Sequence, residues 1–177
     1  MNLRVTFYVS KQACSGYINL HDEERLSDFL NDRFAKRSDG SNGFIKITDA
    51  AMTLPDNSKE RLPEATINKS AIQLVAIQEE DQARGLGGKE GMKSYPFIDK
   101  TPMLVRMHLQ EFSIIGNMHF VVGQTPLDLL EEKQMFIPLT QAKMLTPDMT
   151  SWWKTPFVAV NREKITILSN ANGLGVN

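Results

Sequence analysis

The sequence predicts a mainly β protein built from two tandem modules, each a small β-barrel or curved sheet, SH3- or Sm-like in size, with about five short strands and one short helix. Two observations support this fold class. Short runs of residues alternate between apolar and polar, which is typical of half-buried strands. The first and last thirds of the chain also share one order of apolar, turn and polar residues, and internal repetition is a strong guide to architecture.

Domain boundaries follow from this repetition. We expect the first module at residues 1–77 and the second at residues 103–170. Residues 78–102 are charged and then glycine-rich without an apolar period, which indicates a flexible linker. Residues 171–177 are expected to form a flexible tail. A module of this size buries little surface alone, so we expect the copies to pack on each other or on another subunit.

The repeat consists of four collinear blocks that differ little in spacing. Matched residues lie 100 positions apart at the start, then 92 and finally 93 apart, because the first copy carries eight extra residues around 35–43. These blocks predict a tandem duplication. The matched anchors are Gly16 with Gly116, Asp28 with Asp128, Phe44–Ala50 with Phe136–Ala142, and Asn68 with Asn161.

A hairpin is the first element expected in each module. Val5–Val9 and Gly16–Leu20 both alternate in polarity, and a short polar segment connects them. Gly16 and Gly116 stand at the same place in the two copies. Because glycine otherwise weakens a strand, we predict a bulge or bend at both.

A short helix follows the hairpin, at residues 25–31 in the first copy. In the second copy, Thr125 is a suitable N-cap and Pro126 occupies the first helical position. Asp28 and Asp128 recur early in these helices, where a carboxylate accepts hydrogen bonds from free backbone N–H groups. We interpret both acids as helix caps rather than catalytic groups, since no second acid or base shares their spacing.

The remaining elements are a third strand and a last hairpin. The third strand covers residues 44–51 and, in the second copy, 136–143. Residues 65–67 and 71–77 are expected to form the last hairpin, matched by 157–160 and 164–168. Asn68 and Asn161 fall in its turn, where asparagine tolerates a left-handed backbone.

Composition narrows the functional classes. The chain has 177 residues, 41% of them hydrophobic and 23% charged, and its net charge of −1 creates no general attraction for nucleic acid or anionic membranes. No apolar run approaches the ~20 residues that cross a bilayer, and the start of the chain lacks the pattern of a signal peptide. Cys14 is the single cysteine, so no intrachain disulfide can form. We therefore expect a cytoplasmic protein without a membrane partner.

Three segments are similar to a known pattern. They read Arg-Leu-Ser-Asp-Phe-Leu-Asn at 25–31, Phe-Ile-Lys-Ile-Thr-Asp-Ala at 44–50 and Phe-Val-Ala-Val-Asn-Arg at 157–162. Together they resemble a family of uncharacterised bacterial small-domain proteins, a domain of unknown function, with Leu-Ser-Asp-x-Leu-Asn, Leu-Thr-Asp-Ala and Val-Ala-Val-Asn segments. The resemblance covers both copies but not the linker, and departs at 127–129 and 65–68. It implies module boundaries and no activity.

Two patterns invite comparison with ligand sites. Gly85–Lys89 is glycine-rich before a lysine, but it lacks the preceding strand, the Ser or Thr and the helix of a phosphate-binding loop, so we interpret it as linker. His108 and His119 lie on consecutive expected strands and on one face, where they could bind a metal together with Glu111. Solvent-facing strand residues are the favoured interpretation, so no catalytic, cofactor or metal site is assigned.

Trp152, Trp153 and Lys154 form the candidate interaction surface. We expect them in a polar loop between Thr150 and Pro156, and the first copy has no counterpart. Adjacent residues of an extended segment face opposite ways, so at least one indole is poorly placed for its own core, and tryptophan is enriched among interface anchors. A loop that covers the core is the alternative.

These observations favour a non-enzymatic protein that acts through protein–protein contacts, including self-association into a homo-oligomer, through the tryptophan loop and exposed strand edges. Nucleic-acid binding is the first alternative, because small barrels often bind single strands. An enzyme or metal-binding protein with a site between the two copies is the second. The positive charge that a nucleic acid would need in the first copy comes from Arg4, Lys11, Lys36, Arg37, Lys46 and Lys69.

Overall fold

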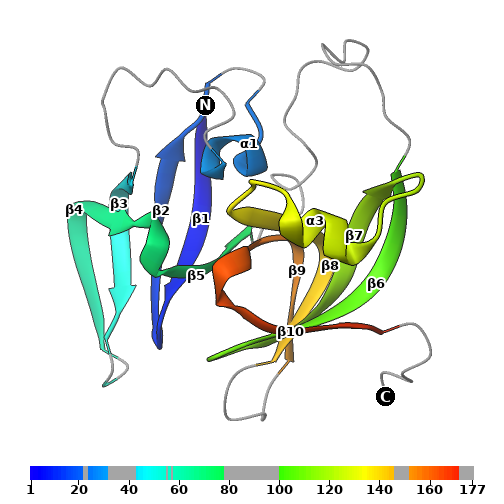
Figure 1. Ribbon diagram of the computed structural model, residues 1–177. Helices are drawn as coiled ribbons and strands as arrows, with labels where there is room; N and C mark the ends of the chain where they lie inside the picture. Colours follow the sequence, from blue (N-terminus) through cyan, green and yellow to red (C-terminus); the bar gives the residue numbers. More distant parts are fainter. Residues whose placement is uncertain are drawn as a thin grey trace.

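The structure, a computed structural model, describes residues 1–21, 24–31, 43–54, 56, 58–77, 100–145 and 152–171 (Figure 1). Its strands form one ten-stranded antiparallel sheet in the order β10-β6-β7-β8-β9-β5-β1-β2-β3-β4. The predicted mainly β fold is therefore confirmed.

Two halves of the chain repeat the same order of elements. Each half has two strands, a short helix, two strands, one turn of 3-10 helix and a final strand. The first half contains β1 (Asn2–Val9), β2 (Gln12–Asn19), α1 (Leu26–Leu30), β3 (Phe44–Thr53), β4 (Lys59–Asn68), η1 (Lys69–Ala71) and β5 (Ile72–Ile77). The second half contains β6 (Lys100–Leu109), β7 (Ser113–Val121), α3 (Pro126–Glu131), β8 (Phe136–Leu145), β9 (Trp152–Asn161), η2 (Arg162–Lys164) and β10 (Ile165–Asn170).

The sheet is open, so the barrel form expected for each module is wrong, whereas the alternative of an open sheet agrees with the structure. Strands β4 and β5 do not form the predicted last hairpin, because η1 carries the chain between them and they lie on opposite sides of the first half. The same holds for β9 and β10. Instead of closing within its own half, β9 pairs with β5 of the other half, and β5 runs between the two groups of strands (Figure 1).

Glycine bulges bend both halves at matching places. The register between β2 and β3 shifts at Gly16, and that between β7 and β8 shifts at Gly116, so the predicted bulges are confirmed. A Cβ on Gly16 would lie 3.0 Å from the carbonyl oxygen of Thr48, closer than a side chain tolerates without movement. Facing the two glycines, Asp49 and Gln141 adopt left-handed backbones with φ of 48° and 50°.

The helix caps agree with expectation in the second half. Thr125 accepts a hydrogen bond from the backbone N–H of Asp128, while the carboxylate of Asp128 accepts one from the N–H of Thr125, with Pro126 at the start of α3. These hydrogen bonds lower the pKa of Asp128. In the first half Arg25 is the N-cap and makes no side-chain capping bond, although Asp28 still lies in the first turn, where the helix dipole favours an acid.

Asn68 and Asn161 were expected in left-handed turns, and this expectation is wrong. Their φ and ψ angles are −70° and 120° for Asn68 and −68° and 116° for Asn161, which are extended. Each asparagine caps a 3-10 helix, its side-chain oxygen accepting a hydrogen bond from the N–H two residues on, Ser70 or Glu163. The two asparagines therefore hold matching places in the two halves, and each starts a 3-10 helix.

Two hydrophobic clusters form the core, and each takes side chains from both halves. The first cluster is built mainly from β1 to β5 but includes Phe136 and Ala159. The second is built mainly from β6 to β9 but includes Leu74 and Ala76 of β5. The two halves are therefore joined through their interiors as well as through backbone pairing.

The predicted linker and tail fall largely outside the described residues. Strand β6 begins at Lys100, three residues before the expected start of the second module at 103. Residues 78–99, with Gly85–Lys89, and residues 172–177 are not described. Ala171 is described and is completely buried, with its N–H donating to the carbonyl oxygen of Leu104.

Candidate functional site

The junction between β5 and β9 is the most highly organised contact between the halves. Leu74 pairs with Val160, and the register continues to Ile77 opposite Phe157. Asn161, completely buried at the end of β9, donates a 2.8 Å hydrogen bond from Nδ2 to the carbonyl oxygen of Ile72. The junction therefore combines a short antiparallel ladder with a buried side-chain bond.

A second polar contact closes the opposite corner of the junction. Asn31, directly after α1, donates from Nδ2 to the carbonyl oxygen of Phe136 at 2.9 Å. Its Oδ1 accepts from the N–H of the same residue at 2.8 Å. One amide thus satisfies both backbone groups of Phe136, which would otherwise lie at the outer edge of β8. The Phe136 ring is completely buried in the first cluster.

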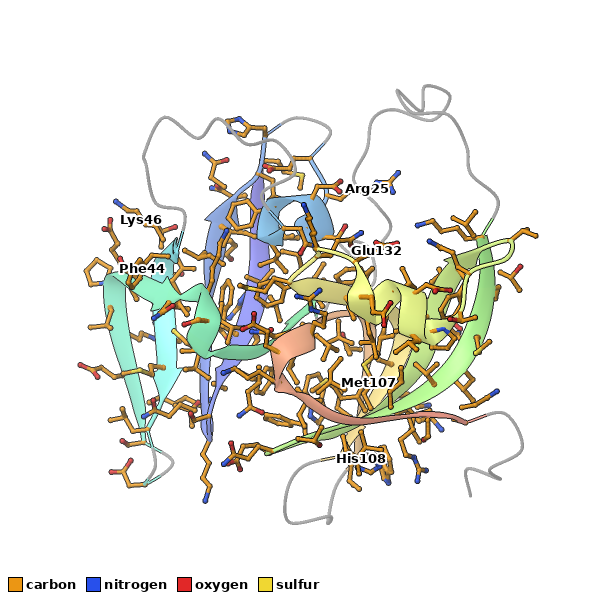
Figure 2. The ribbon with its side chains drawn as sticks, viewed as in Figure 1. Arg25, Phe44, Lys46, Met107, His108 and Glu132 are labelled. Carbon is orange, nitrogen blue, oxygen red and sulfur yellow. The ribbon has the colours of Figure 1, made fainter. Side chains whose placement is uncertain are left out.

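A cavity of about 490 Å³ lies where the two halves meet. This volume is within the ~300–1,000 Å³ range of small-molecule sites. Its apolar lining comes from both halves, for example Leu3, Ile77 and Met118. Arg25 and Glu132, from the ends of α1 and α3, both line it, and Figure 2 shows them on the side where the two helices approach.

Hydrogen bonds hold the polar groups of this cavity in place. His119 Nε2 lies 2.8 Å from Thr140 Oγ1. The amides of Gln124 and Gln134 donate to the two carboxylate oxygens of Glu132, at 3.1 and 2.7 Å. Because these groups already have partners, the cavity offers polar contacts of fixed orientation.

His119 is expected to make stability depend on pH. Burial, and to a lesser extent the positive charge of Lys100, lowers the pKa of His119. The unfolded chain therefore takes up this proton first, and stability is lost as the pH falls through the unfolded value of about 6.5. We expect His119→Gln to flatten the thermal midpoint against pH on the acid side, whereas His108→Gln, the control, keeps the wild-type slope. An unchanged slope for His119→Gln would contradict this assignment.

The metal site considered for His108 and His119 does not form. His108 pairs with Ser113 and His119 pairs with Pro102, so six residues of β6 separate the two histidines along the hairpin. At about 3.3 Å per residue this is about 20 Å, too far for one metal ion. Within the described parts of the chain, no group of three His, Cys, Asp or Glu side chains could hold a metal.

Trp152, Trp153 and Lys154 lie at the start of β9 and not in a loop, which corrects the expectation. Trp153 stacks on Tyr8 of β1 with ring centroids 5.6 Å apart, and Tyr8 also meets Phe112 edge-on at 5.3 Å. Trp152 faces the other way and is 45% exposed, as adjacent strand residues must. Only one indole is therefore available as a surface anchor.

The two tryptophans are expected to differ in their effect on stability. Trp153→Ala removes the stack on Tyr8 and opens the edge of the second cluster, so it should lower the free energy of unfolding by about 2 kcal/mol. Trp152→Ala should change it by less than about 0.5 kcal/mol. Urea unfolding followed by circular dichroism measures both, and equal losses would show that Trp152 also supports the fold.

The sequence analysis expected contacts at exposed strand edges, and the structure identifies which strands and residues these are. Among the described residues, no strand pairs with the outer side of β4 or of β10. Beside β4, Phe44 of β3 is 50% exposed, and on β10 Ile167 is 58% exposed. Their matched positions in the other half, Phe136 and Leu74, are completely buried. The spacing between the two halves was the available signal for pairing these positions, but the difference in exposure is visible only in the structure.

The remaining candidates do not converge on a site. Cys14 is buried, and burial raises the pKa of its thiol, which disfavours the reactive thiolate. Among the basic residues considered for nucleic acid, Lys69 is 3% exposed and Lys46 pairs with Glu64 at 2.6 Å. Lys36 and Arg37 lie outside the described residues.

Comparisons with known proteins add no family. No family model matches the chain, and no curated protein and no solved structure matches it. Among the helices in the described ranges, none is long and apolar enough to cross a membrane.

Proposed function

We propose that this protein is a non-enzymatic assembly protein that acts through protein–protein contacts and associates with copies of itself. One observation carries the proposal: in the described part of the chain the sheet is open at both ends, while its own halves are joined edge to edge by β5 and β9. Exposed strand edges are templates for pairing with another chain. A chain that joins its halves in this way and leaves two further edges free is suited to assembly.

Tandem duplication of one module is part of the same proposal. The shared element order, the bulges at Gly16 and Gly116 and the left-handed Asp49 and Gln141 support it. The N–H of Lys69 donates to the carbonyl oxygen of Gly43, and that of Arg162 donates to the carbonyl oxygen of Met135, at matching places. If a self-associating module were doubled, one contact between modules would become the internal pairing of β9 with β5. The corresponding strands β4 and β10 would remain at the two ends of the sheet.

Sedimentation velocity over a wide range of protein concentration tests self-association. We expect the weight-average sedimentation coefficient to rise with concentration, or to stay at the value of an oligomer. Tryptophan fluorescence recorded over the same range reports any change around the exposed Trp152. A monomer at every concentration, with constant fluorescence, would refute the proposal.

A small-ligand role is the second candidate function, favoured by the cavity between the halves. Its apolar walls, and charged side chains of both signs such as Lys100 and Glu132, suit an amphipathic organic molecule. Leu129→Trp would fill part of this space from α3. Anilinonaphthalene sulfonate, a fluorescent amphipathic anion, is expected to bind the native protein, and Leu129→Trp should weaken that binding. No binding to the native protein would refute this role.

A further inference from the structure

We infer that β4 of one chain pairs with β10 of a second copy, in the register that joins β9 to β5 within the chain. The inference rests on the proposed self-association and names its surfaces. Strand β9 holds the same place in the second half that β4 holds in the first, and β5 likewise matches β10. One pairing of this kind is present inside the chain, and its two counterpart strands are the two free edges.

The repeat spacing predicts the intermolecular register. Within the chain, Leu74 pairs with Val160 and Ala76 with Val158. Adding 93 to the β5 residue and subtracting 93 from the β9 residue gives the matching pair at the two ends of the sheet. The first pair becomes Ile167 opposite Ile67, and the second becomes Ser169 opposite Ala65. The contact joins two different surfaces, so it is heterologous and, when repeated, gives a closed ring or an open fibre.

Exposed apolar side chains lie where this pairing would bury them. Leu74 is buried in the second cluster, beyond the junction, whereas its counterpart Ile167 is exposed at the end of the sheet. In the partner copy, Ile167 would lie opposite Ile67 and diagonally beside Ala65, which is only partly buried at the rim of the first cluster. Phe44 lies at the β4 end of the sheet, beside Lys46 (Figure 2). The second copy would cover it as Phe136 is covered inside the chain.

Polar groups at the edges are compatible with the same contact. Asn161 donates to the carbonyl oxygen of Ile72 across the internal junction, and the matching donor and acceptor are Asn68 and the carbonyl oxygen of Ile165. Asn68 already accepts from Ser70 N–H as Asn161 accepts from Glu163 N–H. In place of the internal stack of Tyr8 on Trp153, the register puts His108 beside Glu60, a pair able to form a hydrogen bond.

Charges that protect an edge strand lie mostly outside the pairing segment. Lys59, Glu60 and Arg61 precede Pro63, which matches Pro156, and the internal ladder with β5 begins only at the residue after Pro156. Within the matching part of β4, Glu64 is the charged residue, and it is paired with Lys46. A proline and charges before this segment limit the length of an added strand without preventing it.

The contact between chains should be weaker than the one within the chain. Glu131 stands at the position of Asn31, so the amide that satisfies both backbone groups of Phe136 has no equivalent for Phe44. Leu62 replaces Thr155, whose hydroxyl donates to the carbonyl oxygen of Ile77. We therefore expect reversible, concentration-dependent assembly.

Charge substitution at the edge tests the surface. Ile167→Lys is expected to abolish the concentration-dependent species seen by sedimentation velocity, because the ammonium would enter the partner's apolar rim. Val122→Lys is the matched control, since Val122 is a more exposed aliphatic residue, 84% exposed and distant from both edge strands in sequence. Assembly that survives Ile167→Lys, or is lost equally in Val122→Lys, would overturn the inference.

Disulfide cross-linking tests the register in a Cys14→Ala background, which leaves no other thiol. A mixture of Ala65→Cys and Ser169→Cys chains is expected to form a cross-linked dimer on mild oxidation. A mixture of Glu64→Cys with Ser169→Cys, slipped by one residue, places the thiols on opposite faces and should cross-link far less.

The outcomes separate the two levels of the proposal. Monomers at all concentrations would refute both self-association and the edge contact. Oligomers in which the Ala65→Cys and Ser169→Cys chains fail to cross-link, or in which Ala65→Cys chains cross-link only to each other, would overturn the edge contact and leave self-association standing. Preferential cross-linking in the mixed sample would support both.

Discussion

Asn161→Ala is expected to lower the free energy of unfolding by about 2 to 4 kcal/mol. The side chain is completely buried and makes hydrogen bonds at both ends. Alanine would leave the carbonyl oxygen of Ile72 unsatisfied in the interior of the junction, and would remove the cap from the N–H of Glu163. Leaving a buried polar group without a partner costs more than the bond itself contributes. Equilibrium urea unfolding at low protein concentration measures the loss.

Asn68→Ala is the matched control for this substitution. Asn68 caps η1 as Asn161 caps η2, but it lies at the free edge and is exposed. Only the cap is lost, so we expect a loss of about 0.5 to 1 kcal/mol. The difference between the two variants measures the bond across the junction. Equal losses would show that the junction bond adds nothing beyond capping.

Phe136→Ala is expected to have the larger effect on packing, about 3 to 5 kcal/mol. Its ring is completely buried in the cluster of the opposite half, so the substitution leaves a cavity between the halves. The two bonds from Asn31 go to its backbone and remain possible in alanine. The loss therefore reports side-chain packing, and it is read from the urea midpoint together with an unchanged m-value.

Phe44→Ala provides the comparison at the outer end of the sheet. Half of this side chain is exposed in the single chain, so we expect a loss of about 1 kcal/mol or less when the protein is dilute. At concentrations that favour association, the same variant should assemble less readily than the wild type. A large loss in dilute protein would show that Phe44 already has an interior role.

Local features were predictable where one residue type has one physical role. Gly16 interrupts a strand that otherwise alternates, and glycine is the residue that a bulge with close backbone contact requires. Thr125 followed by Pro126 is a strong sequence signal for a helix start. These features depend on a few neighbouring residues, so no knowledge of the tertiary structure was needed.

Strand partners were not predictable, because the same pattern suits more than one pairing. Phe157–Val160 is apolar throughout, so it fits equally beside the next strand in sequence or beside β5. Trp152 and Trp153 were assigned to a polar loop between Thr150 and Pro156, and proline is disfavoured inside a paired strand. In the structure, neither the pairing with β5 nor that with β8 includes Pro156, so its missing N–H costs no ladder bond.

The separation of His108 from His119 shows the same limit. Alternation assigns both to one face, but their distance depends on the position of the turn, which sequence alone left open. Identifying Phe44 and Ile167 as edge residues also required the structure. Their exposure becomes informative only when it is compared with the burial of the matched residues Phe136 and Leu74.

Neither half of the molecule forms a complete hydrophobic cluster from its own residues. Phe136 and Ala159 fill the first cluster from across the junction, and Leu74 and Ala76 fill the second in return. If one half unfolded, the hydrophobic cluster of the other half would lose the side chains that cross the junction, and its remaining apolar residues would be exposed to water. Heat or denaturant should therefore unfold both halves together, in one cooperative step, although the strands fall into two groups along the chain.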